Sequence, residues 1–154
     1  MNNQAVPPID EATLNKVGAS CTCFSLRKAA RVVTQLFDEM MAPSGLLVTQ
    51  FSILGVIATI KESTMNQLAQ YLVMDRTTLT RNLKPLEREG LIQINPGKDK
   101  RTRLISLTPQ GVAALQKALP LWEQSQAAMV SQLGQERWES LMLHLSDTTH
   151  LLSR

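Results

Sequence analysis

Residues 64–91 read TMNQLAQYLVMDRTTLTRNLKPLEREGL, and this stretch decides the fold. It opens on a capping box, because the Thr64 hydroxyl can accept from the amide of Gln67 while the Gln67 side chain reaches back to Thr64. A short helix should follow. The connection at 73–75 has only three residues, and Asp75 is placed to cap the next helix. The pattern therefore predicts two short helices joined by a tight turn.

The second of these helices should run from about residue 76 to 89 and be amphipathic. Its apolar residues recur at spacings of four and three, so they share one face that packs on the first helix. Pro85 lacks the amide that would bond the Arg81 carbonyl, so we expect a kink there. Gly90 should end the helix as a left-handed cap. The residues expected inside are Leu68, Ala69, Leu72, Leu79, Leu83 and Leu86, and those expected on the outer face are Arg76, Thr77, Thr80, Arg81 and Lys84.

Two short strands are predicted after the helix pair, at 91–94 and 103–107. The segment between them, 95–102, contains asparagine, proline and glycine, which are typical of turns. It also carries three basic residues, Lys98, Lys100 and Arg101. The expected product is a β-hairpin with a positively charged tip.

Long helices should flank this central region. From about residue 9 to 41 the pattern is helical, and its apolar stripe is expected to be buried. The stripe consists of Leu26, Ala30, Val33, Phe37 and Met40. Residues 43–45, Pro-Ser-Gly, should break the helix, and Thr49 is the expected N-cap of another helix that ends near Lys61.

After the hairpin, Thr108-Pro109 should start a further long helix, since proline fits the first turn. Pro120 should kink this helix and Gly134 should interrupt it. Its apolar residues recur at spacings of three, four and seven, which favours packing between helices of two chains. They are Val112, Leu115, Leu119, Trp122, Met129, Leu133, Trp138, Leu141, Leu145 and Leu152. We therefore predict a flexible N-terminal arm (1–8), a helical dimerisation region (9–45 with 109–154) and a winged helix-turn-helix DNA-binding domain (46–108).

The composition fits a globular protein that works in the cytoplasm. Hydrophobic residues make up 44% of the chain, enough for a sizeable core, and no apolar run reaches about 18 residues. The first ten residues lack the features of a signal peptide, so we expect no membrane partner. We also expect no enzyme activity and no cofactor, because no nucleophile with a base, no paired-carboxylate motif and no phosphate-binding glycine loop occurs.

Positive charge is concentrated in the middle of the chain. Residues 61–105 hold nine Lys and Arg against five Asp and Glu, a net charge of +4, while the rest, with seven against eight, has −1. Such an excess suits a phosphate backbone, and an exposed helix fits the major groove of DNA. A solvated basic loop beside an ordinary helix pair is the alternative explanation. The candidate DNA-binding residues are Thr64, Asn66, Arg76, Thr77, Thr78, Thr80, Arg81, Lys84, Lys98, Asp99, Lys100, Arg101 and Arg103.

Four motifs in this order resemble the MarR family of transcriptional regulators. They are the stretch 68–92, Asp99-Lys100-Arg101 in the hairpin, the Leu107-Thr108-Pro109-x-Gly111 motif, and Gln50 with its neighbours; together they cover roughly residues 23–116. The resemblance implies an obligate homodimer with interleaved terminal helices, in which two winged domains read a pseudo-palindromic operator. It also implies that Asp99 and Arg101 help to fix the wing and reach the minor groove. Pro85 departs from the family pattern.

Cys21 and Cys23 form a second candidate site. The segment from Cys23 to Gln50 resembles, without gaps, the branch of the family that senses organic hydroperoxides through a cysteine near the start of the first helix. That branch has two supporting tyrosines, and the matching positions here hold Phe37 and Val48. On one helix, side chains two residues apart point about 200° away from each other, which disfavours a disulfide within the chain. Thiols that only pack and a redox sensor both stay open, whereas a metal site lacks a nearby histidine or third cysteine.

The sequence thus predicts a mainly α-helical, dimeric DNA-binding regulator of transcription. The leading hypothesis is a repressor that a small apolar or phenolic ligand releases, as the resemblance suggests, with Met40-Met41 expected to line an apolar pocket. One alternative is a redox-sensing repressor that acts through Cys23. Others are a DNA-binding activator or nucleoid-type protein without an effector, and a winged-helix adaptor that binds proteins instead of DNA.

Overall fold

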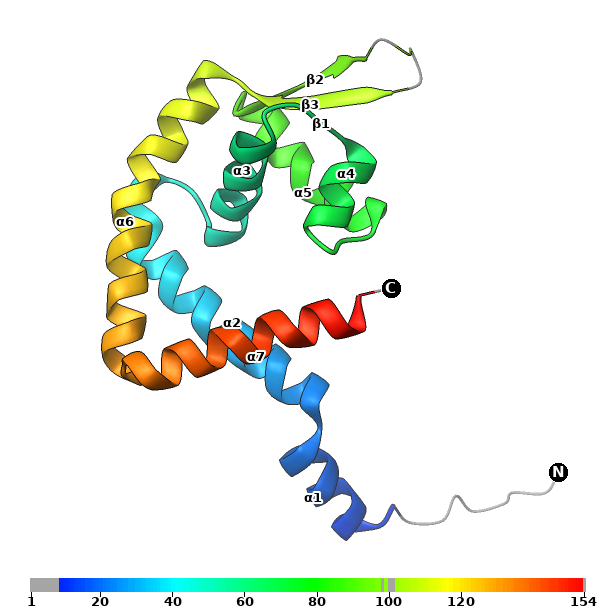
Figure 1. Ribbon diagram of the computed structural model, residues 1–154, viewed down its shortest axis with the longest axis vertical. Coiled ribbons are helices and arrows are strands. Elements are labelled where there is room, and N and C mark those ends of the chain that lie inside the picture. Colours follow the sequence, from blue (N-terminus) through cyan, green and yellow to red (C-terminus); the bar gives the residue numbers. More distant parts are fainter. Residues whose placement is uncertain (1–8, 98, 100–101, 154) are drawn as a thin grey trace, which may run out of the picture. The chain divides into compact units, whose positions relative to one another are not determined.

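Helices predominate in the computed structural model, which describes residues 9–97, 99 and 102–153 (Figure 1). The predicted flexible arm at 1–8 lies outside these residues. The chain divides into two compact units, residues 1–35 and 36–154. A mainly α-helical fold with one small sheet is thereby confirmed.

The first unit contains α1 (Glu11–Ser20) and most of α2 (Thr22–Met41). Asp10 caps α1, because its carboxylate accepts hydrogen bonds from the Thr13 hydroxyl at 2.7 Å and from the amides of Thr13 and Ala12. These bonds, with that from the Thr13 hydroxyl the strongest, hold the pKa of Asp10 below its ordinary value.

The helix predicted as continuous from 9 to 41 is interrupted at Cys21. This residue has a ψ of 106°, which is extended, so α1 ends before it and α2 starts after it. No proline marks the interruption, which is why apolar periodicity did not reveal it.

The second unit contains the remaining elements. After the 3-10 helix η1 (Ala42–Ser44) come the helices α3 (Val48–Ile60), α4 (Met65–Tyr71), α5 (Arg76–Arg88), α6 (Pro109–Leu133) and α7 (Gln135–Leu152). The strands β1 (Ser63–Thr64), β2 (Ile92–Pro96) and β3 (Arg103–Leu107) form an antiparallel sheet in the order β1-β3-β2. The predicted hairpin is confirmed. Strand β1, in which Ser63 pairs with Ile105, was not predicted, because two residues are too few to show alternation.

The core of this unit forms where α3, α4 and α5 meet the sheet. Its fully buried side chains are aliphatic, as the shortage of aromatic residues requires, and they include Met41, Leu54, Ile57, Leu68, Leu79, Leu83, Leu86 and Ile105. Burial of one such side chain contributes about 1.5–3 kcal/mol. The apolar faces predicted for the helix pair therefore pack as expected, although Leu72 is only half-buried.

The start of α3 was predicted two residues too late, because the N-cap is Leu47 and not Thr49. Thr49 does not cap it: the helix starts at Val48, whose amide donates to Asp38 Oδ1 at 2.7 Å, and the Leu47 amide donates to Gln50 Oε1 at 2.9 Å. The carboxylate thus comes from α2, ten residues upstream. A cap supplied by another helix leaves no local signature at the position it caps.

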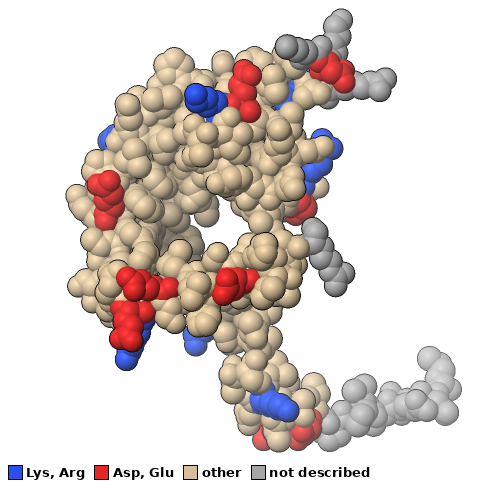
Figure 2. Space-filling model, viewed as in Figure 1, with Lys and Arg blue, Asp and Glu red and all other residues tan. Residues whose placement is uncertain are grey.

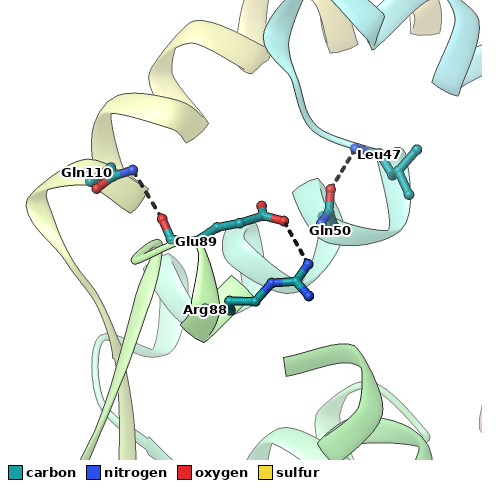
Figure 3. Close-up of polar contacts among 5 residues, drawn as sticks. All are labelled: Leu47, Gln50, Arg88, Glu89 and Gln110. Carbon is teal, nitrogen blue, oxygen red and sulfur yellow. Dashed lines mark hydrogen bonds and ion pairs between the residues drawn. The ribbon is translucent and has the colours of Figure 1, made fainter. Parts of the chain in front are cut away.

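The end of α5 is tied to the start of α6 (Figure 3). The Gln110 side chain donates to the Glu89 carbonyl at 3.1 Å, and the Thr108 hydroxyl donates to the Gly90 carbonyl at 2.6 Å. Gly111 packs so closely that a Cβ atom on it would lie 1.9 Å from the Leu91 carbonyl oxygen. Only glycine fits at that position, which fixes where α6 leaves the sheet.

The terminal helices leave their apolar stripes largely uncovered. Of the stripe predicted to be buried in α2, only Phe37 is buried, whereas Leu26 is 41% exposed. Neither α1 nor α7 contains a buried residue within the described part of the chain. The stripe of α2 is therefore largely exposed in the single chain, and its burial within the predicted dimerisation region (9–45 with 109–154) stays a prediction.

The predicted start of α6 and its interruption at Gly134 are confirmed, whereas the kink at Pro120 and packing against a second chain stay predictions. Pro109 starts α6, Pro120 lies inside it, and Gly134, with a φ of 82°, separates it from α7. Among the described residues, no single helix is long and apolar enough to cross a bilayer. The one pair that passes that test together, Thr22–Ser44 with Val48–Ile60, is bent by 74°.

Candidate DNA-binding surface

A helix, a tight turn and a second helix form the centre of this surface. Helix α4 begins with the predicted capping box: the Gln67 amide donates to Thr64 Oγ1 at 3.2 Å, and the Thr64 amide donates to Gln67 Oε1 at 2.9 Å. In the turn, the Met74 amide donates to the Ala69 carbonyl at 2.9 Å. Val73 there adopts a φ of 51°, which a β-branched residue rarely does.

Asp75 fixes the start of α5. Its Oδ1 accepts from the amides of Thr77 and Thr78, both at 2.9 Å, and its Oδ2 accepts from the Thr78 hydroxyl at 2.6 Å. The bond from the Thr78 hydroxyl is the main cause of the lowered pKa of Asp75, and the charge of Arg81 lowers this pKa further. Thr78, predicted to bind DNA, thus has its hydroxyl engaged in the cap.

The outer face of α5 is exposed, as predicted. Thr80 uses its hydroxyl within the helix, where it donates to the Arg76 carbonyl at 2.7 Å. Pro85 lies within α5, and the helix continues past it to Arg88. The exposed residues of this face are Arg76, Thr77, Thr80, Arg81 and Lys84.

The hairpin supplies the third part of the surface. At its turn the Gly97 amide donates to the Thr102 carbonyl and the Thr102 amide donates to the Asp99 carbonyl, both at 2.8 Å. Arg103, the first residue of β3, is exposed. Three predicted residues, Lys98, Lys100 and Arg101, lie outside the described residues.

Four of the predicted residues line one hollow of about 260 Å³: Thr64, Asn66, Arg76 and Arg103. Met65 and Thr102 complete its walls and were not predicted. They belong to it because β1 pairs with β3, which places the start of α4 beside the base of the hairpin. Because β1 was not predicted, nothing in the sequence indicated that Met65 and Thr102 line the same hollow.

The pair Met40-Met41, predicted to line an apolar effector pocket, is largely enclosed in the single chain, and the effector site stays a prediction. Met41 is fully buried and belongs to the core, so it does not line an open pocket, and Met40 is half-buried. A larger open hollow of about 910 Å³ is lined instead by Tyr71 of α4 and by residues of the α7 end, namely Ser146, Thr149, His150 and Ser153.

Both cysteines are free thiols near the interruption between α1 and α2. Cys21 is half-buried and accepts a hydrogen bond from the Phe24 amide at 3.5 Å, while Cys23 is exposed in the first turn of α2. Because Cys21 is extended, the two residues do not share one helix, and the 200° argument against a disulfide was wrong. In the described part of the chain, no group of three or more His, Cys, Asp or Glu residues is placed to hold a metal ion.

A helix-turn-helix followed by an antiparallel hairpin, with an exposed polar recognition helix, defines the winged helix-turn-helix class of DNA-binding proteins. The MarR family model matches residues 44–102, which span α3, α4, α5 and β2. An HTH-type transcriptional regulator of Bacillus cereus is 32% identical over 116 residues, which cover 75% of this chain and 78% of that protein. The HTH-type regulator YwoH of Bacillus subtilis is 34% identical over 85 residues, 55% of this chain and 62% of YwoH.

The fold agrees with that assignment. The Mycobacterium tuberculosis transcriptional regulator MosR, solved in complex with DNA, is similar with a TM-score of 0.76 and 41% identity, over 88% of this chain and all of that one. The chain belongs to the MarR family of transcriptional regulators.

Proposed function

We propose that this regulator binds a pseudo-palindromic operator in double-stranded DNA as a homodimer and represses transcription there. The observation that carries the proposal is the outer face of α5, where Thr77 and Arg81, one helical turn apart, are both exposed. These side chains offer hydrogen-bond donors, a hydroxyl and a methyl group, which suit base edges in the major groove. The similarity to MosR, which was crystallised with DNA, supports the same partner. The hairpin residues Lys98, Asp99, Lys100 and Arg101 are proposed to contact the neighbouring minor groove.

The homodimer is supported by the uncovered helices. Helix α7 exposes large apolar side chains along its length, although apolar stripes of helices normally face a core. The exposed residues of α7 are Leu141, Met142, Leu143, Leu145, Leu151 and Leu152, and those of the first unit are Leu14, Val17, Phe24, Leu26 and Val32. The face of the second unit seen in Figure 2 is mostly uncharged, which also suits burial. A second copy of the chain is the partner that a two-fold operator requires.

We propose that a small apolar or phenolic molecule releases the operator and that the protein acts in the cytoplasm, where it does not catalyse a reaction. The hollow beside Tyr71 and His150 offers a phenol, an imidazole and several hydroxyls around an open volume. Such a mixture of apolar walls and a few polar groups suits an amphipathic aromatic ligand.

The test is selection of an operator from a random duplex pool, followed by anisotropy titrations over several salt concentrations. We expect the wild-type protein to enrich an inverted repeat. Arg81→Ala should weaken operator binding about 10-fold and reduce discrimination against mismatched sites. Arg88→Ala removes the same charge from a residue that pairs with Glu89 at 3.9 Å, and serves as the control. A wild-type protein that enriches no sequence contradicts the proposal.

Thiol-based sensing is a second candidate, favoured by the placement of Cys23. This thiol is exposed in the first turn of α2, and Cys21 lies just before that helix. An organic hydroperoxide would oxidise Cys23 to a sulfenic acid and leave as an alcohol, and a second thiol would then displace water to form a disulfide. Against this route, Phe37 and Val48 carry no hydroxyl to stabilise the oxidised sulfur.

Operator release by organic hydroperoxide, compared between wild type and Cys23→Ser, separates the two candidates. We expect wild-type protein to keep its operator at low-micromolar hydroperoxide. Release by the wild type alone, with a disulfide from Cys21 or Cys23 in the mass spectrum, would establish the redox mechanism instead.

A further inference from the structure

We propose that the hollow between the start of α4, the start of α5 and the base of the hairpin is a seat for one backbone phosphate of the bound DNA. This inference rests on the proposed DNA binding and assigns Arg76 and Arg103 to the phosphate instead of to bases. The hollow has a volume of about 260 Å³ and is lined by Thr64, Met65, Asn66, Arg76, Thr102 and Arg103.

Within the described part of the chain, the hollow is lined by two arginines and no acidic residue, so an anion is the ligand that suits it. Arg76 and Arg103 come from different elements, α5 and β3, yet both line it. Two arginine side chains that line one small space give it a local positive charge, which attracts an anion. A phosphodiester oxygen accepts hydrogen bonds from both, and arginine suits it because its donors are arranged as a planar fork.

No described carboxylate serves as that anion. The nearest in sequence, Asp75, already has both oxygens engaged by Thr77 and Thr78. Among the described residues, Arg88 and Glu89 form an ion pair at 3.9 Å, in which neither Arg76 nor Arg103 takes part. Both guanidinium groups are thus available to a ligand that approaches from solvent.

The walls of the hollow are held in place independently of any ligand. Thr64 has its hydroxyl engaged by Gln67 in the capping box, so it positions α4 without donating into the hollow. The pairing of Thr64 with Leu104 places α4 next to Arg103. Asn66, exposed in the first turn of α4, adds an amide donor. A rigid seat of this kind fixes how the protein lies on the duplex, as phosphate contacts generally do.

Two different kinds of DNA contact are thereby assigned to residues of α5. Arg76 at its first position contacts the backbone, whereas Thr77 and Arg81, farther along the exposed face, are left to read bases. Loss of Arg76 should therefore weaken binding to every sequence equally. Loss of Arg81 should weaken the operator more than other sites.

The test compares Arg76→Gln, Arg103→Gln and the double variant with Arg88→Gln, which removes the same charge outside the hollow. Each protein is titrated against the selected operator and a scrambled duplex over a range of salt concentrations, after matching thermal melts confirm folding. We expect each single variant to lose about 10-fold in affinity for both duplexes, with the slope of log K against log salt reduced by about one. Because both arginines hold one phosphate, the double variant should reduce the slope by about one as well.

Three results would overturn the seat while leaving the proposed function standing. One is a wild-type salt slope in both single variants. Another is a loss by Arg76→Gln confined to the operator, which would make Arg76 a base-reading residue. The third is a slope reduced by two in the double variant, which would mean two separate phosphates. Failure of the wild-type protein to bind either duplex would instead contradict the proposed function.

Discussion

The winged lobe (η1 to the first turn of α6, residues 42–111) and the terminal helices differ in how their apolar side chains are covered. In the lobe, α3, α4 and α5 each contribute fully buried leucine or isoleucine residues, and the helix ends are capped by Thr64, Asp75 and Thr108. Helices α1 and α7 also carry large apolar side chains but contain no buried residue. The lobe buries its core within one chain, whereas the terminal helices leave apolar surface that the proposed second copy would cover. Stability of the lobe should therefore depend on internal packing, and stability of the terminal helices on assembly.

Gly111→Ala should have the largest effect on stability, because Gly111 makes a close contact with the backbone of Leu91 in the lobe. The new Cβ atom would lie 1.9 Å from the Leu91 carbonyl oxygen, and backbone on both sides cannot yield as a flexible side chain would. We expect the free energy of unfolding to fall by about 3 kcal/mol, the upper end for overpacking. Urea denaturation measures it. In the control, Gly55→Ala, the added atom meets nothing within 4 Å inside α3, so that variant should gain about 0.5–1 kcal/mol. Equal effects of the two changes would refute the close approach.

Leu145→Glu tests the other side of the comparison. Leu145 is 38% exposed in the single chain and lies on the α7 stripe with Leu141 and Leu152. If a second copy covers this stripe, an unpaired carboxylate there should cost about 2 kcal/mol, or roughly 30-fold in the dimer dissociation constant. Sedimentation equilibrium measures that constant. Ser146→Glu places the same charge on a different face of α7 and should change it little. A wild-type protein that is monomeric at all concentrations would remove the contrast between the two regions.

The two regions also differ in how far sequence alone predicted them. In the lobe, the capping box at Thr64, the cap at Asp75 and the buried leucines of α5 follow from local spacing, and all are present. What was missed there depends on contacts distant in sequence: Asp38 caps α3, and Ser63 pairs with Ile105 to form β1. The exposed face of α5 was likewise predicted from the spacing of its apolar residues. The hollow at Arg76 and Arg103 was not, because it exists only through the pairing of β1 with β3.

In the terminal helices, periodicity identified the apolar stripe but not what covers it. A stripe buried inside a chain and one buried between chains have the same spacing, so the spacing predicted that Leu26 is buried without showing that it is 41% exposed in the single chain. The interruption at Cys21 was missed because no proline or glycine stands at that position.

Val73→Gly should strengthen the lobe at the turn between α4 and α5. Val73 holds a φ of 51°, which favours glycine, and its side chain is 63% exposed, so little packing is lost on its removal. We expect a gain of about 1 kcal/mol in the free energy of unfolding, since strain of this kind costs about 1–3 kcal/mol. Thermal denaturation measures it. Val32→Gly, also at an exposed valine but inside the regular helix α2, should be neutral or destabilising. A loss of stability in Val73→Gly would show that the turn is not strained.

Asp75→Asn tests the cap of α5 through its pH dependence. The pKa of Asp75 is lower in the folded protein than in the unfolded chain, mainly because of the Thr78 hydroxyl. Its contribution to stability is therefore fully present above the unfolded pKa of about 3.9 and is lost as the pH falls through the folded pKa. Asparagine also caps helices but does not titrate in this range. The difference in urea midpoint between wild type and variant should shrink below about pH 4, and a difference constant down to pH 2 would contradict the assignment.

Ser63→Ala should produce the smallest change in the free energy of unfolding, and the sign of that change is what tests the structure. Ser63 is 1% exposed, and its Oγ has no hydrogen-bond partner among the described residues. A buried hydroxyl without a partner retains its desolvation penalty, so its removal should raise the free energy of unfolding by up to about 1 kcal/mol. Ser44 is the matched control: it is also buried, but its Oγ donates to the Met41 carbonyl at 2.7 Å and accepts from the Leu46 amide at 3.1 Å. Ser44→Ala should therefore lower the free energy of unfolding by about 1 kcal/mol. If Ser63→Ala destabilises the lobe as much as Ser44→Ala does, the Ser63 hydroxyl has a hydrogen-bond partner in solution. The buried polar groups of the lobe would then be more completely hydrogen-bonded than the structure indicates.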